Sequence, residues 1–217
     1  MPGAVAEELE IQRGDRGPLG PPADGGEEGG GGEARRVPRR AYFTAISLAL
    51  AAIVMFFMAL TSSFIVRRGM GGDWQPVRLP RILWLNTAVL LASSVTIEAA
   101  RRKPARGFAG FRVWWGITTA LGFAFLAGQL LAWHQLAAAG VYMASNPMSS
   151  FFYVLTASNG AHLGGGLLAL LYVAFRPWTP GAGARITQDT AAELASIYWH
   201  FMDGLWVFLF LLLTLGR

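Results

Sequence analysis

The sequence predicts an all-α integral membrane protein, a bundle of five transmembrane helices with the N-terminus inside and the C-terminus outside. The chain has 217 residues, of which 53% are hydrophobic and only 14% are charged, and its mean hydropathy is +0.41. Soluble domains carry about 25% charged residues. Two further observations, the length of the apolar runs and the placement of basic residues between them, predict the number and the direction of the helices.

Five apolar runs follow one another along the chain. Each approaches or exceeds the ~20 residues that a helix needs to cross the hydrocarbon core. Helices are expected because lone strands cannot satisfy their backbone in lipid, and a barrel would show short alternating segments. The predicted spans are 42–66, 82–100, 113–139, 151–175 and 194–215, within one membrane domain, 41–217.

Residues 1–40 differ from the rest of the chain. They are rich in Gly, Pro and Glu and contain almost no aromatic residues, so they bury too little surface to fold alone. They lack a basic start followed by an apolar run, which argues against a cleavable signal or a transit peptide. We expect a disordered cytoplasmic tail, with the first apolar run acting as the insertion signal.

The charged residues report topology. The net charge of +5 suggests nucleic acid, but the basic residues of the membrane domain lie between apolar runs. Most flank the side that carries the N-terminal tail, as in Arg101-Arg102-Lys103, so the positive-inside rule places the N-terminus inside. We expect no nucleic-acid partner. The absence of cysteine excludes disulfides, thiolate-ligated clusters and thiolate copper sites.

The last run carries ionisable groups at membrane depth. Four polar residues at helical spacing share one stripe, which should face protein: Glu193, Ser196, His200 and Asp203. One interpretation is a set of polar contacts between helices, worth about 0.6 kcal/mol each. The other is a proton or ligand site, because ionisable groups in the membrane are costly. Contacts between helices are the commoner use.

Helix geometry predicts that His162 and Asp203 lie at one depth. We therefore expect them to meet directly or through Asn159, Ser158 or water, and so to link the last two helices.

Further residues are expected to join helices. Asn86 and Gln129 are lone polar residues in apolar runs, typical of hydrogen bonds between helices. Gly160 and Gly164 form a G-x-x-x-G pair, extended by Thr156, Gly165 and Gly166, and this small-residue face allows another helix to approach closely.

Neither a metal site nor a catalytic centre is expected in this chain. The three histidines, His134, His162 and His200, lie one on each of the last three runs and at different depths. A haem-copper centre needs more imidazoles than this.

Three segments taken together resemble subunit III of haem-copper respiratory oxidases, the cytochrome c oxidase subunit III family. Tyr198–Phe210 resembles the family's W-H-F-V-D-x-x-W-L-F-L-F motif, and a Glu precedes it, as in the family, at Glu193. Leu85–Thr96 resembles L-N-T-x-x-L-L-x-S-G-x-T, and Thr156–His162 resembles T-G-F-H-G-x-H with only its second histidine. The resemblance covers nearly all of 42–213.

The resemblance implies a five-helix member of the family, in a multi-pass position in a bacterial-type inner membrane. It further implies a non-catalytic subunit that packs on subunit I beside subunit II and binds phospholipid. The haem and copper would lie in the partner subunits, which reduce oxygen and pump protons in aerobic respiration, and cytochrome c would be the electron donor.

Departures from the family pattern leave alternatives open. Ile53 stands where the family usually has a carboxylate in the membrane, and Ala132 stands where the family often has a Glu shortly after Gln129. Asn159 replaces the first histidine of the T-G-F-H-G-x-H motif. The chain could therefore serve a quinol oxidase or be the related protein associated with nitric oxide reductase. An alternative from another class is a stand-alone transporter or proton channel that uses His162, His200 and Asp203, although transporters are expected to show internal repeats and none is found.

Overall fold

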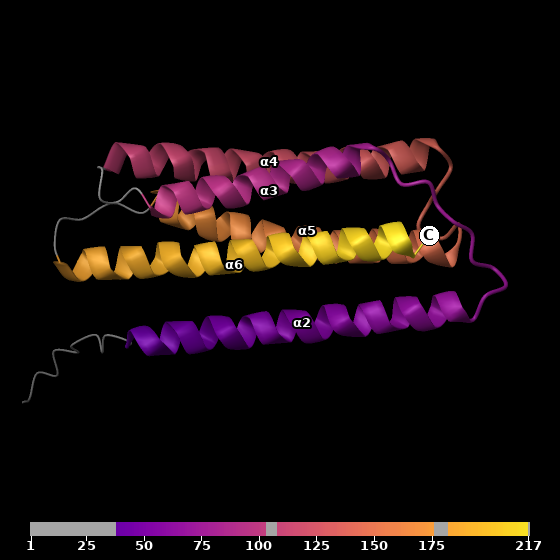
Figure 1. Ribbon diagram of the computed structural model, residues 1–217, viewed down its shortest axis with the longest axis horizontal. Coiled ribbons are helices and arrows are strands. Elements are labelled where there is room, and N and C mark those ends of the chain that lie inside the picture. Colours follow the sequence, from indigo (N-terminus) through magenta and orange to yellow (C-terminus); the bar gives the residue numbers. More distant parts are fainter. Residues whose placement is uncertain (1–37, 103–107, 176–181, 217) are drawn as a thin grey trace, which may run out of the picture. The chain divides into compact units, whose positions relative to one another are not determined.

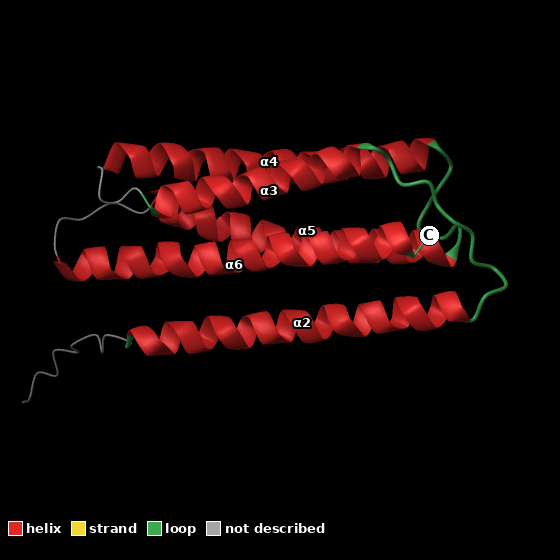
Figure 2. Ribbon diagram, viewed as in Figure 1, coloured by secondary structure: helices red, strands yellow, loops and turns green. Residues whose placement is uncertain are grey.

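The structure is a computed structural model that describes residues 38–102, 108–175 and 182–216. Its described part is helical and contains no strand (Figure 2). The helices are α2 Arg39–Gly69, α3 Ile82–Arg101, α4 Phe108–Ala138, α5 Pro147–Phe175 and α6 Ala182–Leu215 (Figure 1). All five are long and apolar enough to span a membrane. The predicted all-α class and the number of spans are confirmed, whereas the predicted tail lies almost entirely outside the described residues.

Local sequence signals mark the C-terminal end of α4 and the N-terminal start of α5. Gly140, at φ +76°, follows α4, and the N–H of Val141 donates to the carbonyl of Leu136 at 2.9 Å, which is a Schellman arrangement that a side chain at Gly140 would strain. The next helix begins with Pro147 in its first position. Asn146 caps it, because its Oδ1 accepts the Ser149 N–H at 3.0 Å.

The helices differ greatly in the share of their residues that is buried inside the chain. The largest contact joins α3 to α4, while α5 packs on α4 and α6, and α3 also packs on α6. The remaining helix, α2, packs mainly against α5 and α6 (Figure 1). In the most apolar stretch of α2 only 6% of residues are buried, against 39% in α6 and 44% in α4. Most of the core is therefore built by α3 to α6, and α2 adds Ile53, Phe57 and Phe64.

Close packing at glycines occurs at only part of the small-residue face that was expected to allow it. A Cβ atom added to Gly160 or Gly164 would meet no atom of the chain within 4 Å, so the expected close approach at this pair does not occur in the described chain. Contacts are tight at Gly122 and Gly166, where a Cβ would lie 2.7 Å from the Trp199 ring and 2.9 Å from the Tyr198 ring respectively.

Candidate functional site

A serine of α3 links two ionisable residues of α6. The Ser94 hydroxyl donates to Oδ2 of Asp203 and lies 3.0 Å from Nδ1 of His200. A hydroxyl has one proton to donate, so the serine accepts from His200 while it donates to Asp203. This arrangement places the proton of His200 on Nδ1 and gives α3 and α6 a polar contact at membrane depth.

Asp203 is the most deeply buried ionisable side chain of this cluster, with 3% of its surface exposed. Its Oδ1 atom has no hydrogen-bond partner among the described residues. Burying a carboxyl group is costly unless it is hydrogen-bonded, so the single contact with Ser94 is expected to matter more than a polar contact at the surface.

Two buried tryptophans extend the contact between α3 and α6. The Trp199 indole donates to the Ser93 hydroxyl at 2.9 Å, and the Trp206 indole donates to the Thr87 hydroxyl at 3.0 Å. Both rings are completely buried, and a buried indole N–H usually requires an acceptor.

Sequence reasoning identified His200 and Asp203 but missed their partners on α3. The available signal was the seven-residue spacing in that apolar run, which separates Asn86 from Ser93 and Thr87 from Ser94. Residues seven apart share a helix face, so this pattern predicts a polar stripe opposite that of α6.

His162 lies in a different environment from Asp203. Its Nδ1 is 2.7 Å from the carbonyl oxygen of Ser158, and its ring packs against Phe56 and Phe57 of α2, with centroids 6.0 and 5.5 Å away. No hydrogen bond joins His162 directly to Asp203 in the described chain, so the predicted direct contact is wrong. A shared depth does not fix the direction of a side chain: His162 faces α2, whereas Asp203 faces α3.

The predicted stripe on α6 therefore divides between neighbours. Glu193 forms an ion pair with Arg39 of α2 at 2.5 Å, with both side chains partly exposed. Ser196 is completely buried, and its hydroxyl has no partner in the described chain. The residues invoked for a transport path, His162, His200 and Asp203, do not form one cluster.

The lone amides occupy the interior. Asn86 donates through Nδ2 to the Phe125 carbonyl of α4 at 3.3 Å, and its amide fills the space left by Gly128. Gln129 and Asn159 are almost fully buried, and the nitrogen and oxygen of both amides lack hydrogen-bond partners within the described residues. Of these amides, only Asn86 makes a hydrogen bond between helices.

The donor set of this chain does not fit haem or copper. In the described residues no three His, Cys, Asp or Glu side chains gather as a metal site would require. His134 is exposed, His162 lies against α2 and His200 contacts Ser94, so no two face one another. Ile53 and Ala132, where the resemblance expects carboxylates, are both buried in the apolar core.

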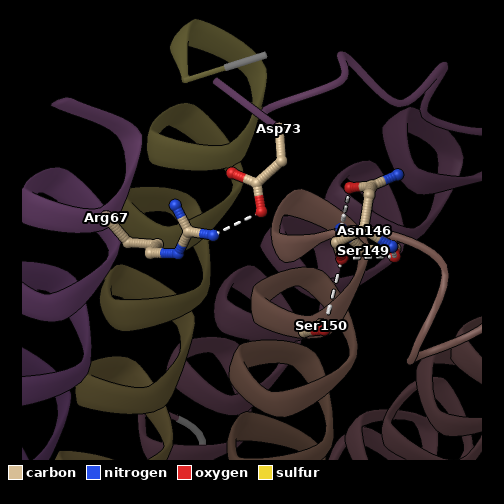
Figure 3. Close-up of polar contacts among 5 residues, drawn as sticks. All are labelled: Arg67, Asp73, Asn146, Ser149 and Ser150. Carbon is tan, nitrogen blue, oxygen red and sulfur yellow. Dashed lines mark hydrogen bonds and ion pairs between the residues drawn. The ribbon is translucent and has the colours of Figure 1, made fainter. Parts of the chain in front are cut away.

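A pocket of about 840 Å³ lies between the end of α2, the connection that follows it and the start of α5. Arg67 and Asp73 line it and form an ion pair at 2.5 Å. The hydrogen bond from Arg67 holds the pKa of Asp73 below its ordinary value. Figure 3 shows the two charged groups pointing toward one another, with the capped start of α5 close by.

Comparison with known proteins identifies the family. A family model described as cytochrome c oxidase subunit III matches residues 41–215. A cytochrome c oxidase subunit 3 from Synechocystis sp. is 35% identical over 177 residues, which cover 78% of this chain and 73% of that protein. The corresponding protein of Thermostichus vulcanus is 34% identical over 73% of this chain and 79% of that protein.

The chain belongs to the cytochrome c oxidase subunit III family. A probable cytochrome c oxidase subunit 3 from Nocardia farcinica is 36% identical over 74% of this chain and 81% of its own length. The chain is thus a subunit III of a haem-copper oxidase and a multi-pass protein of the bacterial inner membrane. The oxidase motif of α6, Tyr198–Phe210, is the segment that supplies the contacts of α6 with α3.

Proposed function

We propose that this chain is a non-catalytic subunit that packs against subunit I, beside subunit II, of an oxidase that uses cytochrome c and pumps protons. Haem and copper lie in the partner subunits in this proposal, and phospholipid fills grooves on the surface of subunit III. The names of its relatives, cytochrome c oxidase subunit 3, favour cytochrome c over quinol as the donor.

The observation that carries the proposal is the use of the polar side chains of α6. His200 and Asp203 contact Ser94, and the two indoles bind hydroxyls of α3. These groups hold the bundle together, which is the role expected of a supporting subunit.

The surface of α2 supports a role in assembly. In this helix only four described residues are buried, on one face: Ile53, Phe57, Thr61 and Phe64. The opposite face is apolar and exposed, with Met55 at 68% exposure and Val66 at 56%. In a membrane such a face contacts lipid or another subunit. We retain, as part of the proposal, the orientation with the N-terminus inside.

Affinity purification of the tagged chain from its native membrane in mild detergent tests the proposal. We expect co-purification of a haem protein, a haem optical spectrum and oxygen uptake driven by reduced cytochrome c. Oxygen uptake driven by quinol and not by cytochrome c would indicate that the chain is a subunit of a quinol oxidase instead. A colourless chain without partners would contradict the proposed assembly.

A further inference from the structure

The end of the bundle at which α2 finishes and α3 begins carries an unbalanced positive charge. Residues 67–81 include four arginines and one acid, Asp73. The connection between α4 and α5 at the same end, residues 139–146, contains no charged residue (Figure 1). Asp73 forms an ion pair with Arg67 at 2.5 Å. The other three arginines, here named the basic edge, are Arg68, Arg78 and Arg81.

The charges of the basic edge are available to a partner. All three arginines are exposed, and within the described residues no ion pair engages them. Arg78 stands outside the spans, because α2 ends at Gly69 and α3 begins at Ile82. An arginine that only anchors a span to the headgroup layer lies at the end of that span. The position of Arg78 therefore indicates a contact beyond the membrane surface.

The connection that carries Arg78 is held against the bundle. Val77 is buried with 5% exposure, and Leu79 is partly buried against the core. Trp74 packs there as well, with its ring centroid 5.3 Å from that of Phe64 of α2. Because both of its neighbours pack inward, Arg78 is presented outward from an anchored segment. A charge held in place in this way suits the recognition of a protein surface.

The positive charge of this end runs against the usual distribution in membrane proteins. In the proposed orientation this end lies outside, where the positive-inside rule disfavours basic residues near the spans. Charge that opposes this rule is expected to have a use on the outer side. Its field attracts anionic macromolecules over about a Debye length, roughly 30 Å at 0.01 M ionic strength and roughly 8 Å at 0.15 M. The basic edge can therefore guide a protein that approaches from solution.

We infer that the basic edge attracts an acidic c-type cytochrome and so raises the rate at which this electron donor meets the oxidase. Transient redox partners associate through opposite charges and small interfaces, so positive charge selects an acidic donor over a basic one. The three arginines act on the encounter alone, and the electron acceptor lies in the partner subunits of the proposed complex. The inference rests on the proposed donor and orientation, and it adds the charge of that donor and the residues that select it.

The experiment uses the whole purified oxidase complex in nanodiscs of phosphatidylcholine, so that the lipid surface carries no net charge. Initial oxygen uptake is measured against donor concentration, with a reduced acidic cytochrome c and separately with a reduced basic cytochrome c. Both series are run at ionic strengths of about 0.01 M and about 0.15 M. The variant is R68Q/R78Q. The matched control is R40Q/R112Q, which removes two exposed arginines at the starts of α2 and α4, the opposite end of the bundle (Figure 1).

With the acidic donor at low ionic strength, kcat/KM of R68Q/R78Q should fall by about three- to tenfold, because steering charge is lost. The fall should nearly disappear at the higher ionic strength, and R40Q/R112Q should match the wild type. With the basic donor, kcat/KM of R68Q/R78Q should rise, because repulsion is removed. Equal kcat/KM of wild type and R68Q/R78Q with the acidic donor would overturn the inference. So would a fall that is the same at both ionic strengths or the same in R40Q/R112Q.

Two further readouts separate this inference from its alternatives. Loss of a subunit from R68Q/R78Q would show that the arginines hold the complex together, and a changed retention of phosphatidylglycerol with unchanged donor kinetics would assign them to lipid headgroups. Either result would overturn the inference. Oxygen uptake with the basic cytochrome c but not with the acidic one would contradict the inference alone. Oxygen uptake with quinol and with neither cytochrome would contradict the proposed donor as well.

Discussion

The last helix, α6, and the first described helix, α2, can both span the membrane, but they differ in how much of their surface is buried inside the chain. In its most apolar stretch α6 buries 39% of its residues and α2 only 6%. The motif of α6 bonds to α3 through Asp203, Trp199 and Trp206. By contrast, α2 is held by ring contacts with His162 and by an exposed ion pair at Arg39. Both helices are apolar enough to span a membrane, but their roles differ: α6 fixes the bundle, and α2 presents surface.

Replacing Trp199 of α6 should lower the stability of the complex most, compared with a matched replacement on α2. W199A removes a fully buried ring that packs on Gly122 and Gly166 and donates to Ser93. Truncating a buried tryptophan costs about 3–5 kcal/mol. We expect a large fall in the unfolding midpoint of the purified complex in denaturing detergent. The control on α2, M55A, should leave it nearly unchanged, and equal losses would contradict the contrast.

The Ser94 contact should give the next largest effect. S94A leaves the buried carboxyl group of Asp203 without its donor, and an unsatisfied buried group costs about 1–3 kcal/mol. Its control is S63A, because Ser63 of α2 bonds only within its own helix in the described chain. For both variants, the yield of intact complex and the midpoint temperature of its thermal unfolding are measured. A midpoint for S94A no lower than that for S63A would show that the contact is dispensable.

Glycine substitutions sharpen the comparison within one helix. In G166A the new methyl group meets the Tyr198 ring at 2.9 Å, and such overpacking costs about 1–3 kcal/mol. In G160A it meets nothing within 4 Å of this chain. The midpoint temperature of thermal unfolding should therefore be lower for G166A and unchanged for G160A. A fall for G160A only in the assembled complex would place a partner helix on that face.

The acid dependence of the Arg67–Asp73 ion pair should be the smallest effect. Asp73 has a pKa below its ordinary value of 3.8 because Arg67 hydrogen-bonds to it. A carboxylate with a lowered pKa stabilises the fold above its unfolded pKa, and this contribution is lost as the pH falls through the lower, folded pKa. The difference in thermal midpoint between wild type and D73N should be constant near neutral pH and shrink below about pH 4. A difference that grows on acidification would be inconsistent with the ion pair.

Hydropathy sufficed to predict the five spans, because crossing lipid requires long helices and little else. The stripe on α6 also followed from spacing, but its partners did not. Periodicity gives the face of a residue on its own helix and not the helix that this face meets, so His162 was wrongly paired with Asp203. The same limit explains the glycines: of the predicted small-residue face, Gly166 contacts a neighbouring ring, whereas Gly160 and Gly164 have no atom of the described chain within 4 Å of an added Cβ.

The central claim is that this chain supports a haem-copper centre held entirely by other subunits. The most direct test removes the chain from the purified oxidase with mild detergent and measures haem and copper per complex, together with the initial oxygen uptake per haem. The account predicts unchanged haem and copper content and continued initial oxygen reduction. Loss of haem or copper in proportion to the chain removed would contradict it.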